Sequence, residues 1–299
     1  MIGRLVFAQH RPWAMDVWGE DWLSVRVDRF PHYRCLAGDY DAFFDYLCAS
    51  WGTDAGVREH IAGFIGFAER CRVERQVLGG PVTLLARDDD LLVVDGNHRA
   101  AIAAFHDLPL PYTMIGLAEY AAMRAERTES RFGALGGAPY HSIHYDGETL
   151  VWGRRDVQDR HSLVAPADLT GKRVLDMGCN LGAASLFAHE MGASVEGWDV
   201  EPTLVTSALR LAVAFGYPIR FRVADISNPP SGEWDTGFCF SVHEHADVSR
   251  AMQQCRVVYM ETHRDSPPPT RLTDGWSVEL RGRTDRGRRR LYRLERCAP

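Results

Sequence analysis

The feature that most constrains this chain is a glycine turn directly after a short apolar strand, in the segment GKRVLDMGCNLGAASLF at 171–187. The apolar run predicts a strand at 173–177, and Gly178-x-x-x-Gly182 predicts a tight turn that opens a helix. Glycine lets the backbone turn sharply and approach a ligand closely. In an open α/β sheet, ligands lie at the carboxyl ends of such strands, so we expect Asp176 and this loop to lie at a binding site.

Beyond this turn, strand and helix patterns alternate. Alternation predicts a parallel sheet, because neighbouring parallel strands need crossover connections that are usually helices. The last segment, WSVELRGRTDRGRRRLYRLER, predicts a hairpin around Asp285-Arg286-Gly287 and therefore an antiparallel edge. The further strands are expected at 194–199, 220–224, 237–241 and 257–261, and the helices at 181–191, 202–215 and 247–254.

The first part of the chain shows a mixed pattern of helices and strands. A stretch rich in glycine and small residues, RFGALGGAPYHS at 131–142, separates it from the rest. We therefore expect a smaller α+β domain at 1–130, a linker and cofactor-covering segment at 131–168, and a second domain at 169–299. Within the first domain, the expected helices are 40–51, 57–71, 97–105 and 117–127, and the expected strands are 81–86 and 91–94.

The glycine loop does not fit a dinucleotide. The dinucleotide fingerprint is G-x-G-x-x-G, whose glycines accommodate a pyrophosphate. Here Asn180 stands in place of the middle glycine, Ala183 stands where the last would be, and the carboxylate of Asp176 would repel a pyrophosphate. S-adenosylmethionine has no phosphate and carries a sulfonium and an ammonium group, so an acidic loop suits it.

Two further carboxylates follow the next two strands. Asp199 ends the second strand, in SVEGWDVEP, where an acid can bind both ribose hydroxyls. Asp225 follows the third strand, in FRVADIS, where its side chain and the backbone of Ile226 can bind adenine. Each aspartate alone is also explained by a helix N-cap or a turn. Three acids at three successive strand ends, together with the glycine loop, favour a ligand site.

These motifs resemble the Rossmann-like S-adenosylmethionine-dependent methyltransferases over 169–299. The resemblance implies an α/β fold with a seven-stranded sheet whose last strand is antiparallel, and it implies S-adenosylmethionine as the cofactor. The implied cofactor-binding residues are Asp176, Gly178, Asn180 and Gly182 around the methionine part, Asp199 at the ribose, and Asp225 with Ile226 at the adenine.

The fourth strand leads into Ser241-Val242-His243-Glu244-His245, and in the resembled family this strand end faces the methyl group. A histidine there can remove a proton from a hydroxyl or amine as the acceptor attacks, so His243 and His245, with Glu244, are the catalytic candidates. The alternative is that these residues cap the next helix. A metal site is a further alternative, because alternate residues of a strand share a face. No third ligand is evident, and we expect no metal.

Other charged residues are expected near the cleft. Glu261 and His263 end the fifth strand, and Arg155 and Arg160 lie before the first strand, where an arginine can bind an anionic acceptor. A solvated surface segment is the alternative for these two arginines. Eight arginines in the last hairpin indicate either a nucleic-acid patch or, as we favour, a charged edge that resists strand pairing.

A second motif lies in the first domain, in LLVVDGNHRAAIAAF. A strand leads into Asp95-Gly96-Asn97-His98-Arg99 and a helix, whose free N–H groups, with the donors of His98 and Arg99, suit a phosphate or another anion. The motif resembles the D-G-x-H-R signature of the ParB/sulfiredoxin-like superfamily, which includes nucleotide-binding segregation proteins, a sulfinic-acid reductase and small-molecule kinases. The reductase cysteine is absent. A helix N-cap at Asn97 with a packed His98 is the alternative.

Composition limits the partners. The chain has 299 residues, a formal net charge of −6 and a pI of about 6.1, which argues against a protein that mainly coats nucleic acid. No apolar run approaches the roughly 20 residues of a membrane span, and no signal peptide is evident, so we expect a cytoplasmic protein. Seven widely spaced cysteines without C-x-x-C argue against disulfides or a zinc ribbon.

The leading hypothesis is a methyltransferase that acts on a hydroxyl or amine of a polar small molecule, with a first domain that binds the acceptor or a nucleotide. The alternative is a DNA or RNA methyltransferase with a ParB-like targeting domain. Against it, the motif Asn-Pro-Pro-Tyr/Phe of many base methyltransferases is absent, since NPPS stands at 228–231. A third hypothesis is a protein that binds the cofactor without catalysis. Asp176, Asp199 and Asp225 do not distinguish it from an enzyme, because all three are expected only to bind the cofactor.

Overall fold

The computed structural model describes residues 2–7, 23–51, 53–129, 139–263 and 266–297. The chain divides into two compact units, 1–120 with 213–216 and 121–212 with 217–299. The predicted boundary at residue 130 lies outside the described residues, so the three predicted segments stay a prediction. No helix in the described ranges is long and apolar enough to cross a membrane.

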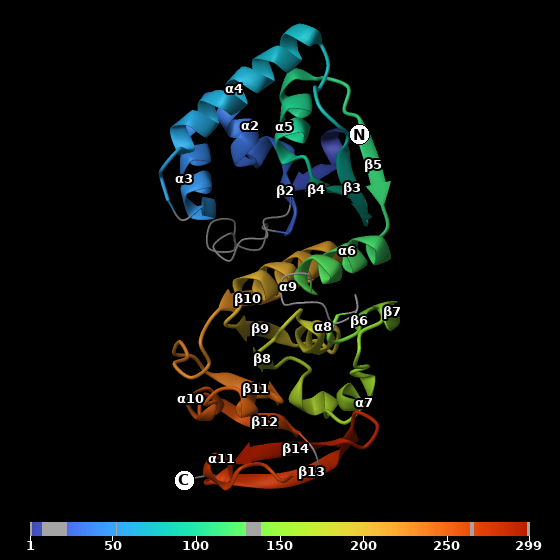
Figure 1. Cartoon of the computed structure of the whole chain (residues 1–299), viewed down its shortest axis with the longest axis vertical. Coiled ribbons are helices and arrows are strands. Elements are labelled where there is room, and N and C mark those ends of the chain that lie inside the picture. Colours follow the sequence, from blue (N-terminus) through green and yellow to red (C-terminus); the bar gives the residue numbers. More distant parts are fainter. Residues whose placement is uncertain (1, 8–22, 52, 130–138, 264–265, 298–299) are drawn as a thin grey trace. The chain divides into compact units, whose positions relative to one another are not determined.

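The first unit contains a mixed five-stranded sheet in the order β2-β1-β4-β3-β5. The pairs β2–β1 and β4–β3 are antiparallel, whereas β1–β4 and β3–β5 are parallel. Figure 1 shows α2, α3 and α4 grouped on one side of these strands. The strands are β1 (Leu5–Phe7), β2 (Val25–Arg26), β3 (Val82–Arg87), β4 (Asp90–Asp95) and β5 (Tyr112–Ile115), and the helices are α2 (Pro31–Leu36), α3 (Tyr40–Trp51), α4 (Val57–Glu74) and α5 (Asn97–His106). A further helix, α6 (Leu117–Glu129), begins in the first unit and continues past residue 120 into the second.

The strand–turn–helix around Gly96 forms as predicted, with β4 before it and α5 after it. Gly96 has a φ of +90°, and a Cβ there would lie 2.7 Å from Cγ1 of Val82, so only glycine fits. The sequence pattern does not predict β1 or β2, which have 3 and 2 residues and are too short to show a period. The likeness of this unit to the ParB/sulfiredoxin-like superfamily stays a prediction.

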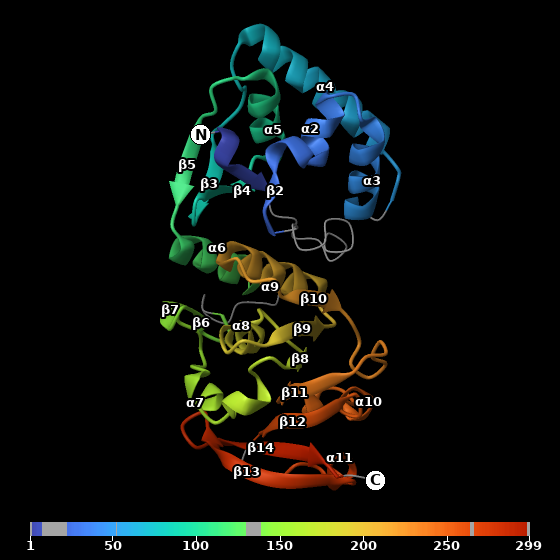
Figure 2. The same ribbon diagram turned by 180° about the vertical axis from the view of Figure 1, so that it is seen from behind.

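The second unit contains a seven-stranded sheet in the order β10-β9-β8-β11-β12-β14-β13. The first five strands of this order are parallel neighbours, and β14 is antiparallel to both β12 and β13. The expected mostly parallel α/β fold with an antiparallel last strand is therefore present (Figure 2). The strands are β8 (Arg173–Met177), β9 (Ser194–Asp199), β10 (Arg220–Val223), β11 (Trp234–Phe240), β12 (Cys255–Thr262), β13 (Trp276–Thr284) and β14 (Arg289–Arg296).

Short helices and one separate hairpin complete this unit. The hairpin pairs β6 (Ile143–Tyr145) with β7 (Glu148–Val151) around a turn at Gly147. The helices are α7 (Gln158–His161), α8 (Ala183–Glu190), α9 (Pro202–Phe215), α10 (Ser249–Met252) and α11 (Thr270–Thr273), with 3₁₀ turns at η4 (Pro166–Asp168) and η5 (Val242–Glu244).

The closing hairpin differs in one respect from the expected antiparallel edge. The antiparallel strand β14 lies inside the sheet, and the outermost strand, β13, runs parallel to β12. Burial explains this order, because Leu291 and Leu294 of β14 are fully buried, whereas Val278 and Leu280 of β13 are 43% and 51% exposed. The strand with the buried leucines takes the inner position.

The glycine that opens α8 provides a test of the packing around the first loop. Gly182 has a φ of +82°, and a Cβ there would lie 2.8 Å from Cζ of Phe221. Gly171 has a φ of +70°, and a Cβ there would meet no atom within 4 Å. We predict that Gly171→Ala lowers the free energy of unfolding by about 1 kcal/mol through backbone strain alone, and Gly182→Ala by about 3 kcal/mol through strain and overpacking. Urea unfolding measures both, and equal losses would contradict the close packing at Gly182.

Candidate active site

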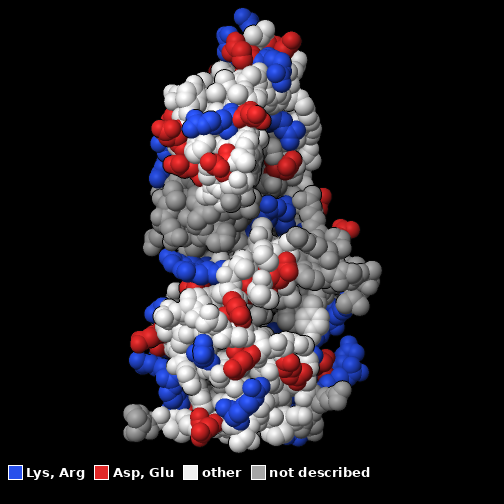
Figure 3. All heavy atoms as spheres, turned by 60° about the vertical axis from the view of Figure 1, so that its left-hand side comes forward, with Lys and Arg blue, Asp and Glu red and all other residues white. Residues whose placement is uncertain are grey.

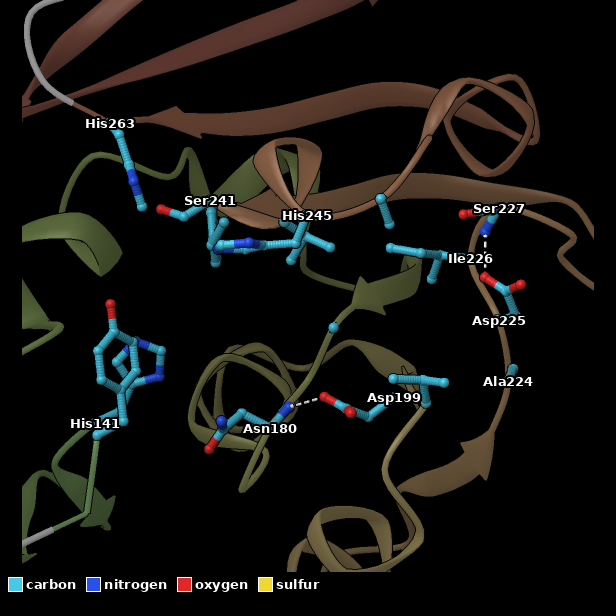
Figure 4. Close-up of a pocket in the computed structure, with 16 residues that line it drawn as sticks. His141, Asn180, Asp199, Ala224, Asp225, Ile226, Ser227, Ser241, His245 and His263 are labelled. Atoms are coloured by element: carbon cyan, nitrogen blue, oxygen red, sulfur yellow. Dashed lines mark hydrogen bonds between the residues drawn. The ribbon is translucent and has the colours of Figure 1, made fainter. Parts of the chain in front are cut away.

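A cavity of about 520 Å³ lies at the carboxyl ends of the parallel strands of the second unit (Figure 4). Open α/β sheets bind ligands at this edge, and the volume is in the range of small-molecule sites. The described residues that line it are Gly178 and Asn180 after β8, Asp199 and Val200 at the end of β9, Ala224, Asp225, Ile226 and Ser227 after β10, Phe240, Ser241, Val242, His245 and Ala246 around the end of β11, and Tyr140, His141 and His263.

The glycine turn brings the backbone of the first loop against the cavity. Gly178 has a φ of +71°, and a Cβ there would lie 2.6 Å from Cγ2 of Val242. Asn180 has a φ of +52°, a conformation that asparagine tolerates better than most residues. Its side-chain oxygen accepts a hydrogen bond from the N–H of Leu181 at 2.8 Å. Asparagine in place of the commoner glycine is therefore compatible with this turn.

Asp199 is held by the backbone on both sides of it. One carboxylate oxygen accepts a hydrogen bond from the N–H of Asn180 at 3.0 Å, and the other accepts one from the N–H of Glu201 at 3.0 Å. Burial raises the pKa of Asp199. The carboxylate thus joins the loops of β8 and β9 while it lines the cavity, and its remaining lone pairs can accept hydrogen bonds from a ligand.

Asp225 and Ile226 lie at one end of the cavity (Figure 4). A carboxylate oxygen of Asp225 accepts a hydrogen bond from the N–H of Ser227 at 2.8 Å, which is an Asx-type turn. The turn role given as an alternative is therefore present for Asp225, and the residue still lines the cavity. The side chain of Ile226 is 6% exposed and supplies an apolar surface beside it.

Asp176 and Gly182, two predicted cofactor-binding residues, do not line the cavity. The carboxylate of Asp176 is buried and accepts a hydrogen bond from the hydroxyl of Ser185 at 2.6 Å. Burial raises the pKa of Asp176 to about 6. Asp176 therefore joins β8 to α8, and Gly182 serves as the left-handed N-cap of α8.

The predicted catalytic residues His243, Glu244 and His245 do not share the face of a strand. β11 ends before Ser241, which has a φ of +69°, and the 3₁₀ turn η5 follows it. The metal-site alternative, in which the two histidines share one face, requires an extended strand, and the chain turns at Ser241 instead. His245 lines the cavity, whereas His243 is buried and does not. In the described parts of the chain, no group of three or more His, Cys, Asp or Glu side chains is placed to hold a metal ion.

Glu244 pairs instead with His263, which follows β12. Oε2 of Glu244 lies 2.5 Å from Nδ1 of His263, and Oε1 accepts a hydrogen bond from the backbone N–H of His263 at 3.2 Å. His263 lines the cavity, as its position after the fifth strand predicts. Burial lowers the pKa of His263, and Arg289 lowers it further.

Glu261, which was also expected at the cleft, is fully buried among arginines and does not line the cavity. Burial opposes its ionisation, but Arg160 and Arg155 outweigh burial and lower the pKa of Glu261 to about 2. Its partners are Thr284 at 2.6 Å, Ser241 at 3.0 Å, Arg155 at 3.1 Å, Arg289 at 3.3 Å and Arg160 at 3.6 Å.

Arg155 and Arg160 are therefore parts of the interior. Their side chains are 9% and 1% exposed, and the guanidinium of Arg160 lies 4.0 Å from the ring centre of Phe240. A solvated surface segment is wrong for these two residues, although Trp152 is 66% exposed. Their role in binding an anionic acceptor stays a prediction, and both already pair with Glu261.

Tyr140 and His141 line the cavity although no sequence pattern identifies them. The only signal is their place in the segment predicted to cover the cofactor. Burial lowers the pKa of His141 well below its usual value, and the charges of Arg160 and Arg155 lower it further. His141 is therefore a neutral group near pH 7.

The predicted anion-binding residues of the first unit surround the start of α5. The guanidinium of Arg99 donates hydrogen bonds to the carbonyl of Gly80 at 2.6 Å and to the carboxylate of Asp95 at 3.3 Å. α5 begins at Asn97, and its N-cap is the preceding glycine, without a side-chain cap. The alternative of an N-cap at Asn97 is therefore wrong.

His98 packs inside the first unit, as that alternative also states. Its Nε2 lies 3.2 Å from Nε2 of His60, and its ring contacts the rings of His32 and Phe64. Burial, assisted by the charge of His60, lowers the pKa of His98 to about 4. His98 is thus an uncharged, packed ring near neutral pH.

Comparison with known families decides the class of the second unit. Residues 174–260 match a family model described as a methyltransferase domain. This segment is similar to methyltransferase domains. It runs from β8 to β12 and carries the glycine loop, Asp199, Asp225 and the turn after β11. The prediction of a methyltransferase from these motifs is confirmed.

The curated relatives of the methyltransferase domain transfer methyl groups to oxygen, according to their names. The magnesium-protoporphyrin O-methyltransferase of Rhodobacter capsulatus is 37% identical over 71 residues, which are 23% of this chain and 32% of that protein. The ubiquinone biosynthesis O-methyltransferase of Xanthomonas euvesicatoria pv. vesicatoria is 33% identical over 92 residues, 29% of this chain and 38% of that protein. The chain thus spans about a third of the length of these relatives.

Solved structures with a similar arrangement include two methyltransferases. The magnesium protoporphyrin IX methyltransferase of Synechocystis PCC 6803 with bound SAM is 23% identical, with 47% of this chain and 77% of that chain covered and a TM-score of 0.40. The bifunctional kinase-methyltransferase WbdD is 23% identical, with 52% and 43% covered and a TM-score of 0.43.

Removal of the Glu261 charge should destabilise the protein strongly. Glu261→Gln leaves the buried guanidinium of Arg160 without its anionic partner, so we predict a loss of about 3–5 kcal/mol in the free energy of unfolding. The depressed pKa means that the contribution of Glu261 is present above pH 4.5 and is lost only as the pH falls towards about 2. Glu279→Gln is the matched control, since Glu279 pairs with Arg281 at the surface and is 54% exposed; we expect a loss below about 1 kcal/mol. Similar losses in urea unfolding would contradict the role of Glu261.

Asp176 predicts a pH dependence of the opposite sign. Its pKa is raised from 3.8 to about 6, so its ionisation destabilises the folded state progressively as the pH rises between these values. Asp176→Asn cannot ionise, and its stability relative to the wild type should therefore improve by on the order of 1–2 kcal/mol between about pH 5 and pH 7.5. Asp274→Asn, at an exposed carboxylate, is the control. A relative stability of Asp176→Asn that does not change with pH would exclude this assignment.

Proposed function

We propose that the second unit transfers the methyl group of S-adenosylmethionine to a hydroxyl or amine of a polar small molecule. The match of 174–260 to a methyltransferase domain supports the reaction class. The names of the curated relatives support an oxygen acceptor, which we take as the first choice. The cofactor is S-adenosylmethionine, which supplies an electrophilic methyl group on a sulfonium.

The observation that carries this proposal is the charge of the cavity. Asp199 and Asp225 line it, and no lysine or arginine stands among its described lining residues. Such a cavity suits a ligand with a sulfonium and an ammonium group and is unfavourable for a pyrophosphate. The half-buried Asp199 carboxylate has lone pairs left for ligand donors. The two carboxylates of the cavity therefore fit S-adenosylmethionine and do not fit a dinucleotide.

In this proposal each strand end binds one part of the cofactor. Asp199 accepts hydrogen bonds from the ribose hydroxyls, and Asp225 and Ile226 contact the adenine at their end of the cavity. Gly178 and Asn180 contact the methionine part, and Gly178 lets the loop lie close against Val242, since a Cβ there would be 2.6 Å from Cγ2 of Val242. Of the histidines assigned to proton removal from the sequence, His245 lines the cavity.

For the first unit we propose binding of the acceptor or of a nucleotide at the turn before α5. The turn at Gly96 directly precedes the first N–H groups of α5, which can bind an anion. The guanidinium of Arg99 lies beside this turn, where it donates hydrogen bonds to Gly80 and Asp95. The packed, uncharged His98 contributes no charge to such a site near neutral pH.

A nucleic-acid acceptor is the weaker candidate. Three arginines of the closing hairpin pair with acidic groups: Arg281 with Glu279 at 2.7 Å, Arg289 with Glu261 at 3.3 Å and Arg293 with Asp168 at 2.8 Å. Basic and acidic side chains are interspersed on the face shown in Figure 3. A nucleic-acid footprint requires a basic surface, so these observations favour a small molecule.

The role of Asp199 is tested by cofactor binding. Asp199→Asn removes the negative acceptor at the ribose, and the loss of charge-assisted hydrogen bonds should weaken the binding of S-adenosylmethionine by roughly 10- to 100-fold. Asp274→Asn is the control and should bind like the wild type. Isothermal titration calorimetry measures both affinities. Unchanged affinity of Asp199→Asn, or competition by NAD⁺, would refute the assigned cofactor site. Release of S-adenosylhomocysteine with hydroxylated acceptors separates an enzyme from a protein that only binds the cofactor.

A further inference from the structure

His263 and Glu244 form a carboxylate–imidazole pair at the cavity. Glu244 belongs to the turn after β11, and His263 follows β12. The Nδ1 atom of His263 lies 2.5 Å from Oε2 of Glu244, and the other carboxylate oxygen accepts the backbone N–H of His263 at 3.2 Å. Two contacts from one carboxylate fix both the place and the ring orientation of His263. Because Nδ1 donates to Glu244, the neutral ring carries its free lone pair on Nε2.

Nε2 of His263 is the atom without a partner. It is buried and has no hydrogen-bond partner among the described residues, while the residue itself lines the cavity. Buried polar atoms in folded proteins are nearly always hydrogen-bonded, so an unpartnered one at a cavity calls for an explanation. A hydroxyl group of a ligand in the cavity would supply the missing donor.

The position of His263 within the cavity fits an acceptor rather than the nucleoside. In Figure 4, Asp225, Ile226 and Ser227 lie at one end of the cavity, and His263 and His141 lie at the other. If the adenine lies beside Asp225 and the ribose at Asp199, as proposed above, the opposite end is left for the reacting methyl group and its acceptor.

The other histidines near the cavity are less suited to gain a proton. His141 is buried near Arg155 and Arg160, whose charges oppose a second cation. His245 also lines the cavity, but among the described residues it forms no ion pair with a carboxylate, whereas His263 pairs with Glu244. His243 does not line the cavity. His263 combines access to the cavity with a carboxylate that stabilises its charged form.

We propose that His263 is the proton acceptor of the methyl transfer and that Glu244 is its positioning residue. The inference rests on the proposed function. The acceptor hydroxyl gives its proton to Nε2 of His263 while its oxygen forms a bond to the methyl carbon. The carbon–sulfur bond breaks, and its electron pair stays on sulfur, which loses its positive charge. The products are a methyl ether, S-adenosylhomocysteine and an imidazolium, which the Glu244 carboxylate beside Nδ1 stabilises.

The charges around His263 set its protonation before the reaction. Glu244 and Glu261 favour the charged ring, whereas burial, Arg289 and Arg155 disfavour it and lower its pKa. His245 lies 6.4 Å away between ring centres, and His243 is also electrostatically coupled to it. The balance leaves His263 neutral near pH 7, as a general base requires.

The tautomer of His263 tests the pair without any acceptor. Long-range ¹H–¹⁵N spectra of the full chain with ¹⁵N-labelled histidine should show His263 near pH 7.5 as the Nδ1–H tautomer with an unprotonated Nε2. Glu244→Gln should lower the pH at which His263 gains its second proton, while His189 on α8 in the same spectra serves as the control. An Nε2–H tautomer, or a His263 titration that Glu244→Gln does not move, would overturn the proposal.

Turnover tests the chemical role with two probe acceptors. Catechol is neutral near pH 7.5, whereas 4-nitrocatechol is largely ionised and needs no base. His263→Asn should lower kcat for catechol by roughly 100-fold or more and should leave 4-nitrocatechol much less affected. Glu244→Gln should shift the pH profile of kcat with catechol and leave the KM for S-adenosylmethionine unchanged. His189→Asn, on α8 and outside the cavity lining, is the matched control and should have near wild-type kcat. Equal losses with both probes, or an active His263→Asn, would overturn the assignment.

Failure of the proposed function and failure of the proposed Glu244–His263 pair give different experimental results. S-adenosylmethionine binding to His263→Asn should equal that of the wild type in calorimetry, which shows that the variant is folded and the cofactor site intact. A wild type that binds S-adenosylmethionine but methylates neither probe would count against the hydroxyl acceptor of the proposed function. The tautomer of His263 would still decide the Glu244–His263 pair.

Discussion

The site depends on one hydrogen bond, from the backbone N–H of Asn180 to the carboxylate of Asp199. It joins the loops of two neighbouring parallel strands, next to the backbone hydrogen bonds that the N–H groups of Gly178 and Cys179 donate to the carbonyl of Trp198. It requires the left-handed backbone at Asn180 and the lack of a side chain at Gly178, which packs against Val242. The turn of the first loop and the position of the Asp199 carboxylate therefore depend on each other. Together they border the cavity at the strand ends.

A buried ion cluster around Glu261 stabilises the end of the site that we assign to the acceptor. The fully buried Glu261 pairs with Arg155 and Arg160 from the segment around α7 and with Arg289 from β14, and it accepts a hydrogen bond from Ser241, which ties β12 to the turn after β11. A buried ion cluster is costly unless every charge is paired. Its value lies in fixing geometry, because the same two strand ends carry Glu244 and His263. The buried Glu261 cluster, which does not line the cavity, thus fixes the strand ends that carry Glu244 and His263.

Much of the second unit follows from local pattern. The bounds of β8, β9 and α9 agree with those expected, because their apolar periods and flanking turns are local signals. Asp199 and Asp225 were expected at the cavity for the same reason, since the end of a parallel strand fixes the place of the next residue. Of the two histidine candidates only His245 lines the cavity, because Ser241 turns the chain out of the strand before them. Nothing near Arg155 or Arg160 in the sequence announces Glu261, which folding brings from a distant segment, and the inward side of Asp176 depends on Ser185 of the next helix.

A crystal structure of the full chain with S-adenosylhomocysteine tests the central claim most directly. The account predicts that the nucleoside fills the cavity at the strand ends, with both ribose hydroxyls on the Asp199 carboxylate, the adenine beside Ile226, and the sulfur directed toward the end that holds His263. A nucleoside bound elsewhere on the chain, or one that lies in the cavity with its ribose away from Asp199, would contradict it.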